Sequence, residues 1–276
     1  MLKQMITIGF GLIISCNNIS SLSQPTIFKN EHTTGEINKH TFSSNILNDS
    51  REIYIWIPKD YYETTHEYSV LILHDGQNVF YPGASMSGHE WHLDETVSDL
   101  IQAHEIEPII MIGVSNSKNR SEEYNPLEIG KKYGRCLTQE LLPAVRSQYR
   151  ITRDKKRIGT MGASMGGLIS LYLGWELNSH FSKAACLSPA LKYKDFNYVK
   201  QLTNKPVDGE LKLVIINGTE DLDKMLQEGV NDFIEYLDLV QFPERELLYL
   251  IGEGDPHSES AWAGQSINAL RWLYPK

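Results

Sequence analysis

Residues 159–167 read Gly-Thr-Met-Gly-Ala-Ser-Met-Gly-Gly and contain the pattern Gly-x-Ser-x-Gly. This pattern is typical of a tight turn from a strand into a helix, which pushes the serine hydroxyl out of the sheet edge. Glycines flank the serine because the turn needs strained dihedral angles and a close backbone approach that a Cβ would block. Ser164 is therefore a candidate nucleophile. The alternative is a glycine-rich turn with an inert serine.

The flanks of this turn fit the same interpretation. Residues 157–159 resemble the end of a short strand, and the apolar run 168–173 predicts a buried helix. Elsewhere, continuous apolar runs bounded by turn residues predict strands, and longer segments with helical spacing predict helices. The strands are expected at 51–57, 70–74, 108–114, 184–188, 211–217 and 246–251, and the helices at 93–103, 133–145, 222–239 and 261–273.

Long buried strands that alternate with helices predict an α/β fold with a mostly parallel sheet covered on both faces. Pro143 lies inside one expected helix and predicts a kink or an early end there. Residues 25–50 are polar with scattered apolar positions and predict an antiparallel hairpin that precedes the main sheet.

The bulk properties indicate one sizeable domain. The chain has 276 residues, and α/β domains of this length are often single. It carries 26 basic and 35 acidic residues, a formal net charge of −9. This balance argues against nucleic acid as a partner, because little would neutralise the phosphates.

The N-terminus has the plan of a secretory signal peptide. One lysine precedes an apolar run, residues 5–14, that is too short to span a bilayer. The run ends in Ile-Ile-Ser-Cys16, which resembles a bacterial lipobox, whose cysteine is acylated. We expect a signal peptide at 1–15, a tether at 16–30 and the folded domain at 31–276. The alternative is a plain signal peptide cleaved later, with Cys16 lost.

This interpretation predicts an exported protein, lipid-anchored to a bacterial membrane and facing the periplasm or the cell surface. Acyl chains on Cys16 would be its contact with the membrane. The two other cysteines, Cys136 and Cys186, lack metal-ligand spacing, so no metal site is predicted. A disulfide between them is one alternative, and two buried free thiols are the favoured one.

A serine nucleophile needs a base that takes its proton and a carboxylate that orients this base. In folds that carry a serine on such a turn, the acid and then the histidine follow later in the chain, each in a loop after a strand. Asp221 follows the strand at 211–217 and is the favoured acid, with Glu220 and Asp223 as rivals. The alternative for these acids is a cluster at a helix N-terminus. His257, between the last strand and the last helix, is the expected base.

The oxyanion of such a reaction needs two backbone N–H donors. One is expected from Met165, directly after the nucleophile, and the other from the loop after an early strand. That loop reads His74-Asp-Gly-Gln-Asn, where Gly76 would allow a close approach to substrate. Gln77 is the favoured donor and Gly76 the second choice. The alternative is a simple Asp-Gly turn.

Three aromatic residues, Trp91, Tyr124 and Trp262, are candidates for lining the substrate pocket, because rings stack well on sugars and aryl acids. Anchoring of the core or of loops is the equal alternative. Trp262 in particular would then pack the last helix and position His257.

Several motifs together resemble the putative-esterase family of α/β-hydrolases, which includes enterochelin, feruloyl and acetyl xylan esterases, S-formylglutathione hydrolases and mycolyltransferases. They occur in the family's order over roughly residues 35–275. The matching stretches are His74–Phe80, Trp91–Asp94, Arg120–Pro126, Glu140–Pro143, Gly162–Leu168, Phe181–Pro189, Gly218–Asp221 and His257–Trp262. The resemblance implies a mainly parallel sheet of eight strands and the triad Ser164, Asp221 and His257.

The resemblance and the motifs together predict an exported serine esterase of a carbohydrate or aryl ester that needs no cofactor. The ester would be a small molecule or an oligosaccharide. The alternatives are a siderophore esterase, an acyltransferase, and a surface binding protein that has lost catalysis. Aromatic walls would favour feruloyl groups, a small pocket acetyl groups, and clustered cations a ferric siderophore. A missing contact between the serine and the histidine would favour the binding protein.

Overall fold

The computed structural model describes residues 20–29, 33–80, 83, 85, 88–202, 207 and 209–276. The expected signal peptide and Cys16 lie outside these residues. No helix within them is long and apolar enough to cross a membrane.

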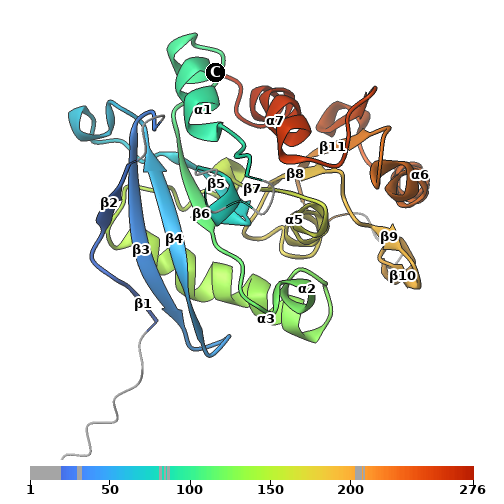
Figure 1. The fold of residues 1–276 in the computed structure, drawn as a ribbon, viewed down its shortest axis with the longest axis horizontal. Coiled ribbons are helices and arrows are strands. Elements are labelled where there is room, and N and C mark those ends of the chain that lie inside the picture. Colours follow the sequence, from blue (N-terminus) through green and yellow to red (C-terminus); the bar gives the residue numbers. More distant parts are fainter. Residues whose placement is uncertain are drawn as a thin grey trace, which may run out of the picture.

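The described chain forms one mixed ten-stranded sheet in the order β1-β3-β4-β6-β5-β7-β8-β11-β12, with β2 also paired to β3 (Figure 1). The six strands from β6 to β12 in this order are mutually parallel, whereas β1 to β4 pair antiparallel. The bounds are β1 Ser21–Leu22, β2 Thr26–Phe28, β3 Glu36–Ser44, β4 Asp49–Ile57, β5 Ser69–His74, β6 Ile109–Val114, β7 Ile158–Ala163, β8 Lys183–Leu187, β11 Lys212–Gly218 and β12 Leu247–Gly252. The expected count of eight strands is thus wrong.

The extra strands come from the N-terminal region. Residues 21–22 and 26–28, expected in a tether, pair with β3 and belong to the sheet. The antiparallel arrangement expected for residues 25–50 is confirmed, although its main hairpin, β3–β4, extends to Ile57. A separate two-stranded ribbon contains β9 Lys192–Tyr193 and β10 Phe196–Asn197.

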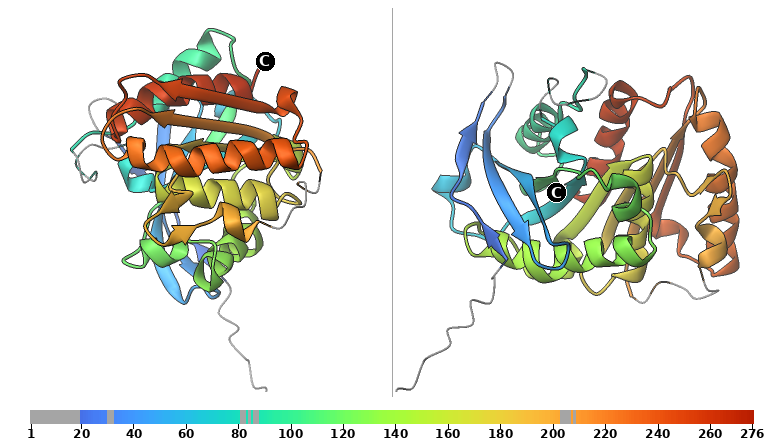
Figure 2. Two further views of the ribbon diagram at one scale, coloured as in Figure 1. Left: turned by 90° about the vertical axis from the view of Figure 1, so that its right-hand side faces the viewer. Right: turned by 60° about the horizontal axis from the view of Figure 1, so that its bottom comes forward.

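Helices cover both faces of the sheet (Figure 2). One apolar core includes buried residues of α1 and α7, and the other includes buried residues of α3, α4, α5 and α6. The bounds are α1 Leu93–Gln102, α2 Arg120–Glu123, α3 Glu128–Cys136, α4 Leu142–Arg146, α5 Met165–Glu176, α6 Asp223–Leu239 and α7 Glu259–Leu273. The two-sided α/β prediction is confirmed.

The helix expected at 133–145 is interrupted before its proline. A π-helical turn, Leu137–Leu141, separates α3 from α4. Pro143 then lies in the first turn of α4, directly after the π-helical turn, whose wider backbone makes room for the proline ring. The local irregularity is therefore a widened turn, and the helical path continues beyond it.

Both described cysteines are buried free thiols, as the favoured alternative predicted. Burial raises the pKa of the Cys136 thiol to about 12. A thiol with so high a pKa is a poor nucleophile near neutral pH.

We expect the ionisation of Asp94, at the start of α1, to lower the stability of the fold as the pH rises. Burial, with a hydrogen bond to Glu95, raises the pKa of Asp94 from 3.8 to about 8, although Thr34 N donates to its carboxylate. Between these two values the folded protein holds a proton that the unfolded chain releases, so stability is lost as the pH rises. Asp94→Asn should gain stability relative to the wild type between pH 4 and pH 9 in thermal melts. A constant difference across that range would contradict this.

Candidate active site

The predicted strand–turn–helix context of Ser164 is present. β7 runs to Ala163, further than the sequence indicated, and α5 begins at Met165. Ser164 between them has φ 58° and ψ −121°, a strained conformation for a residue with a side chain. A Cβ on Gly162 would lie 2.6 Å from the backbone of Gly166, so the turn requires the small residue there.

His257 is paired with Asp223. Its Nδ1 lies 2.5 Å from Asp223 Oδ1 and, since an ionised carboxylate only accepts, donates to it. The Asp223 side chain is fully buried, and that of His257 is 14% exposed. A buried carboxylate on Nδ1 leaves Nε2 as the basic nitrogen and stabilises an imidazolium.

The structure thus places Asp223, one of the two rivals, against His257, and not the favoured Asp221. Asp221 lies in the loop between β11 and α6, is exposed and has φ 49°. Glu220, the other rival, forms an exposed ion pair with Lys224 at 2.7 Å. Asp223 is the first residue of α6, and its side chain turns inward toward the end of β11.

Two further groups hold the Asp223 carboxylate. Its Oδ2 accepts from Ser188 Oγ at 2.7 Å and from Gly218 N at 2.8 Å. Ser188 Oγ in turn accepts from Trp262 Nε1 at 2.9 Å. The Trp262 ring also lies edge-on to the His257 ring, with centroids 4.9 Å apart. Sequence reasoning missed the role of Ser188, which lies at the end of the strand expected at 184–188 and within the matching stretch Phe181–Pro189.

The three aromatic residues that were candidates for the substrate pocket are buried in the protein interior. Trp262 is 8% exposed, Trp91 is 4% exposed and packs against it, and Tyr124 is fully buried. The Tyr124 hydroxyl accepts from Asp75 N at 2.9 Å. These contacts favour the alternative in which all three residues anchor the core or loops, most clearly for the fully buried Tyr124.

The loop after β5 is held rigidly beside the turn at Ser164. β5 and β7 are parallel neighbours, so their carboxyl ends lie at one edge. A Cβ on Gly76 would lie 2.3 Å from Gly113 C, which makes glycine necessary at this point. Gln77 Oε1 accepts from Asn116 N at 3.1 Å. The expected donors Gly76 and Gln77 thus lie in the loop after β5, and Met165 lies at the start of α5, at the same edge of the sheet.

An ion pair clamps the same loop. Asp75, at φ 55°, accepts from Arg120 Nε at 2.7 Å and Nη2 at 2.8 Å, and from Asn116 Nδ2 at 2.6 Å. A Cβ on Gly166 would lie 3.5 Å from Asp75 Oδ2, so this carboxylate reaches the start of α5. Burial opposes the charge on Arg120, but the contact with Asp75 raises its pKa overall. Arg120 therefore neutralises an acid next to the expected oxyanion site.

His74 is not a second base. Its ring is bonded on both sides, to the Tyr133 hydroxyl and to Thr160 Oγ1, each at 2.9 Å. Burial lowers the pKa of His74 to about 3, so it is neutral near neutral pH. The described residues contain no group of three or more His, Cys, Asp or Glu side chains arranged to hold a metal ion.

Among the hydrogen bonds of the described residues, none joins Ser164 Oγ to His257. The two residues follow β7 and β12, whose carboxyl ends face the same side of the parallel sheet. Hydrogen bonds of catalytic groups are often long without substrate and tighten in the complex.

The sheet order, the strained serine turn and the Asp–His pair define an α/β-hydrolase fold. The model of the family described as "Putative esterase" matches residues 44–265, and the chain belongs to this family. A curated relative, the uncharacterized protein YbbA of Bacillus subtilis, is 23% identical over 247 residues, which cover 82% of this chain and 94% of the relative.

Solved structures with the same fold have low sequence identity. The enterobactin esterase FES from Shigella flexneri superposes with a TM-score of 0.70 at 18% identity, covering 86% of this chain. This chain spans only 58% of that enzyme. A ferulic acid esterase superposes with a TM-score of 0.70 at 18% identity, covering 88% of this chain and 98% of its own. The BES protein from Bacillus cereus superposes with a TM-score of 0.68 at 18% identity, covering 91% and 99%.

We expect Asp223→Asn to lower kcat on an ester substrate on the order of 10⁴-fold, because the amide favours the wrong histidine tautomer. Asp221→Asn, two residues away and exposed, is the matched control and should keep kcat within about twofold, as remote surface changes do. Steady-state kinetics with circular dichroism as a folding check measures both. Equal losses in the two variants would refute the assignment of Asp223.

A second prediction concerns the clamp. Arg120→Gln leaves the Asp75 charge next to the developing oxyanion, so kcat should fall about tenfold or more with little change in KM. Adding Asp75→Asn removes that charge and should recover part of kcat. A double variant as slow as the single one would show that Arg120 acts through packing instead.

Proposed function

We propose that this protein is a serine carboxylic ester hydrolase with Ser164 as nucleophile, His257 as base and Asp223 as the acid that orients it. The observation that carries the proposal is the buried Asp223–His257 pair at the sheet edge that also holds the strained Ser164. The family, whose description is an esterase, supports the same reaction class.

In the proposed reaction, His257 Nε2 takes the Ser164 proton as Oγ attacks the ester carbonyl carbon. The N–H groups of Met165 and Gln77, or of Gly76 in place of Gln77, stabilise the oxyanion. The tetrahedral intermediate collapses, and the alcohol leaves with the proton from His257. Water, deprotonated by the same histidine, then attacks the acyl-enzyme and releases the acid.

The proposed substrates are esters of a carbohydrate or of an aryl acid, and the resemblance to a ferulic acid esterase structure supports this range. A siderophore esterase is the second candidate, because enterobactin esterase structures share the fold. Acyl transfer uses the same residues and differs in the acceptor that replaces water. The proposed export and acylation of Cys16 depend on residues 1–16 of the sequence alone.

A binding protein without catalysis is the alternative that the absent Ser164–His257 hydrogen bond favours. Two observations oppose it. The Ser164 backbone stores strain, which persists where function requires it. Asp223 is fully buried and its carboxylate orients His257, an arrangement that binding alone does not need.

The purified mature protein should hydrolyse p-nitrophenyl acetate, and Ser164→Ala should lose that activity on the order of 10⁶-fold. Loss on this scale is expected because the nucleophile itself is removed. Release of p-nitrophenolate measures both rates. No hydrolysis by the folded wild type, or full activity in Ser164→Ala, would refute a serine esterase of this type.

A further inference from the structure

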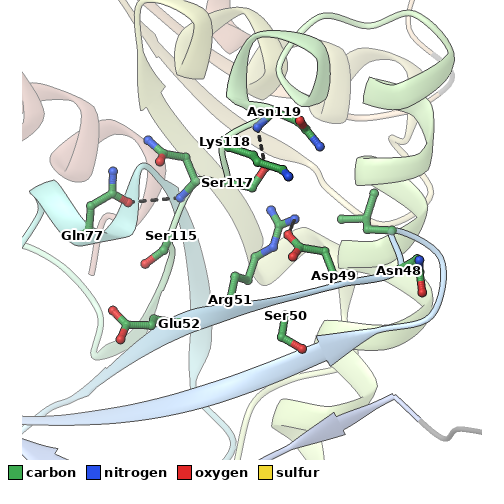
Figure 3. Close-up of a pocket in the computed structure, with 12 residues that line it drawn as sticks. Asn48, Asp49, Ser50, Arg51, Glu52, Gln77, Ser115, Ser117, Lys118 and Asn119 are labelled. Atoms are coloured by element: carbon green, nitrogen blue, oxygen red, sulfur yellow. Dashed lines mark hydrogen bonds and ion pairs between the residues drawn. The ribbon is translucent and has the colours of Figure 1, made fainter.

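A cavity of about 730 Å³ lies beside the loop after β5 (Figure 3). The start of β4 forms one wall, and the loop that follows β6 forms the opposite wall. β4 runs antiparallel to β6, so its start lies at the carboxyl edge of the parallel strands. The cavity therefore opens on the edge of the sheet that carries Ser164.

One residue links the cavity to the proposed reaction site. The side chain of Gln77 lines the cavity and accepts from Asn116 N, while the backbone of Gln77 belongs to the proposed oxyanion loop. An ester whose carbonyl oxygen lies at this loop can extend past Gln77 into the cavity.

The walls favour an uncharged, hydroxyl-rich ligand. Seven of the twelve lining residues carry a neutral hydroxyl or amide, and none is aromatic. The acids Asp49 and Glu52 balance the bases Arg51 and Lys118, so the lining has no net charge. Aryl groups prefer aromatic or aliphatic walls, and a highly anionic iron complex needs an excess of cations. The lining of this cavity therefore suits neither an aryl group nor an anionic iron complex.

Two buried polar groups in the walls lack a hydrogen-bond partner. Arg51 is 6% exposed and Ser115 is 7% exposed, yet Arg51 Nε and Ser115 Oγ have none. The rest of the Arg51 guanidinium is bonded to Glu123, with both contacts at 2.9 Å, and to Asp49. Both atoms are covered by protein, so a ligand hydroxyl reaches them only when the cavity wall shifts, and the bond formed then offsets the cost of an unpaired buried donor.

We propose that this cavity is a subsite for the alcohol portion of the ester, and that this portion is a neutral sugar ring. The inference rests on the proposed function, and it narrows the substrate to carbohydrate esters. Ser115, together with the exposed amine of Lys118, then determines specificity through hydrogen bonds to sugar hydroxyls.

Two substrates with the same acyl group test the subsite: acetylated xylotriose and p-nitrophenyl acetate. In Ser115→Ala and in Lys118→Ala, the ratio of kcat/KM for the sugar ester to kcat/KM for the aryl ester should fall about three- to tenfold. This is the effect expected from the loss of one hydrogen bond to the sugar. Lys200→Ala, a surface lysine on the 3₁₀ turn Val199–Gln201, is the matched control and should leave this ratio unchanged. Ser115→Ala should also keep its thermal midpoint, because the hydroxyl has no partner to lose.

Calorimetric titration of the wild type with xylotriose, cellotriose and maltotriose measures binding without catalysis. Binding of one of them, weakened in Ser115→Ala, is expected. An unchanged substrate ratio in both variants, or no binding of any of these sugars, would overturn the subsite. If p-nitrophenyl acetate is not hydrolysed while a sugar binds, the proposed esterase activity fails and the cavity is a sugar-binding site only.

Discussion

The buried carboxylate of Asp223 is the interaction on which the arrangement of the site depends. It accepts from His257 on one oxygen and from Ser188 and Gly218 on the other. His257 follows β12, Ser188 follows β8 and Gly218 is the last residue of β11, and these three strands are adjacent in the sheet. A charge removed from water is tolerated only where such donors replace its hydration. The same contacts therefore stabilise the buried acid and hold the histidine in one orientation.

The loop after β5 and the His257 side chain are also held in place by several contacts. Asp75 is held by Arg120, Asn116 and the Tyr124 hydroxyl, so the loop after β5 is fixed from three directions. The Trp262 ring packs edge-on against His257, and its Nε1 donates to Ser188, which in turn donates to Asp223. Groups that are already in place need no reorganisation when charge develops, which is the main source of electrostatic catalysis.

Much of the fold could be predicted from the sequence because the central strands are continuous apolar runs. The strands β5, β6, β8, β11 and β12 lie within a residue or two of their expected positions. The N-terminal strands are short or alternate in polarity, and their partners are distant in the chain, so residues 21–28 were expected in a tether. The π-helical turn before Pro143 depends on tertiary packing and has no simple sequence signal.

The site was predictable where a local motif determines it. Ser164 is identified by the glycines around it, and His257 by its place between the last strand and the last helix. The choice among Glu220, Asp221 and Asp223 depends on the path of the loop, in which Asp221 has a positive φ and the side chain of Asp223 is the buried one. Ser188 and the Arg120–Asp75 clamp are contacts between distant segments, which spacing in one sequence does not reveal.

The most direct test of this account is a crystal structure of the protein after reaction with a fluorophosphonate ester. The account predicts a phosphonyl group bonded to Ser164 Oγ, one of its oxygens within hydrogen-bond distance of the amides of Met165 and of Gly76 or Gln77, and His257 still bonded to Asp223. A label on another residue, or a His257 ring turned toward Asp221, would contradict it.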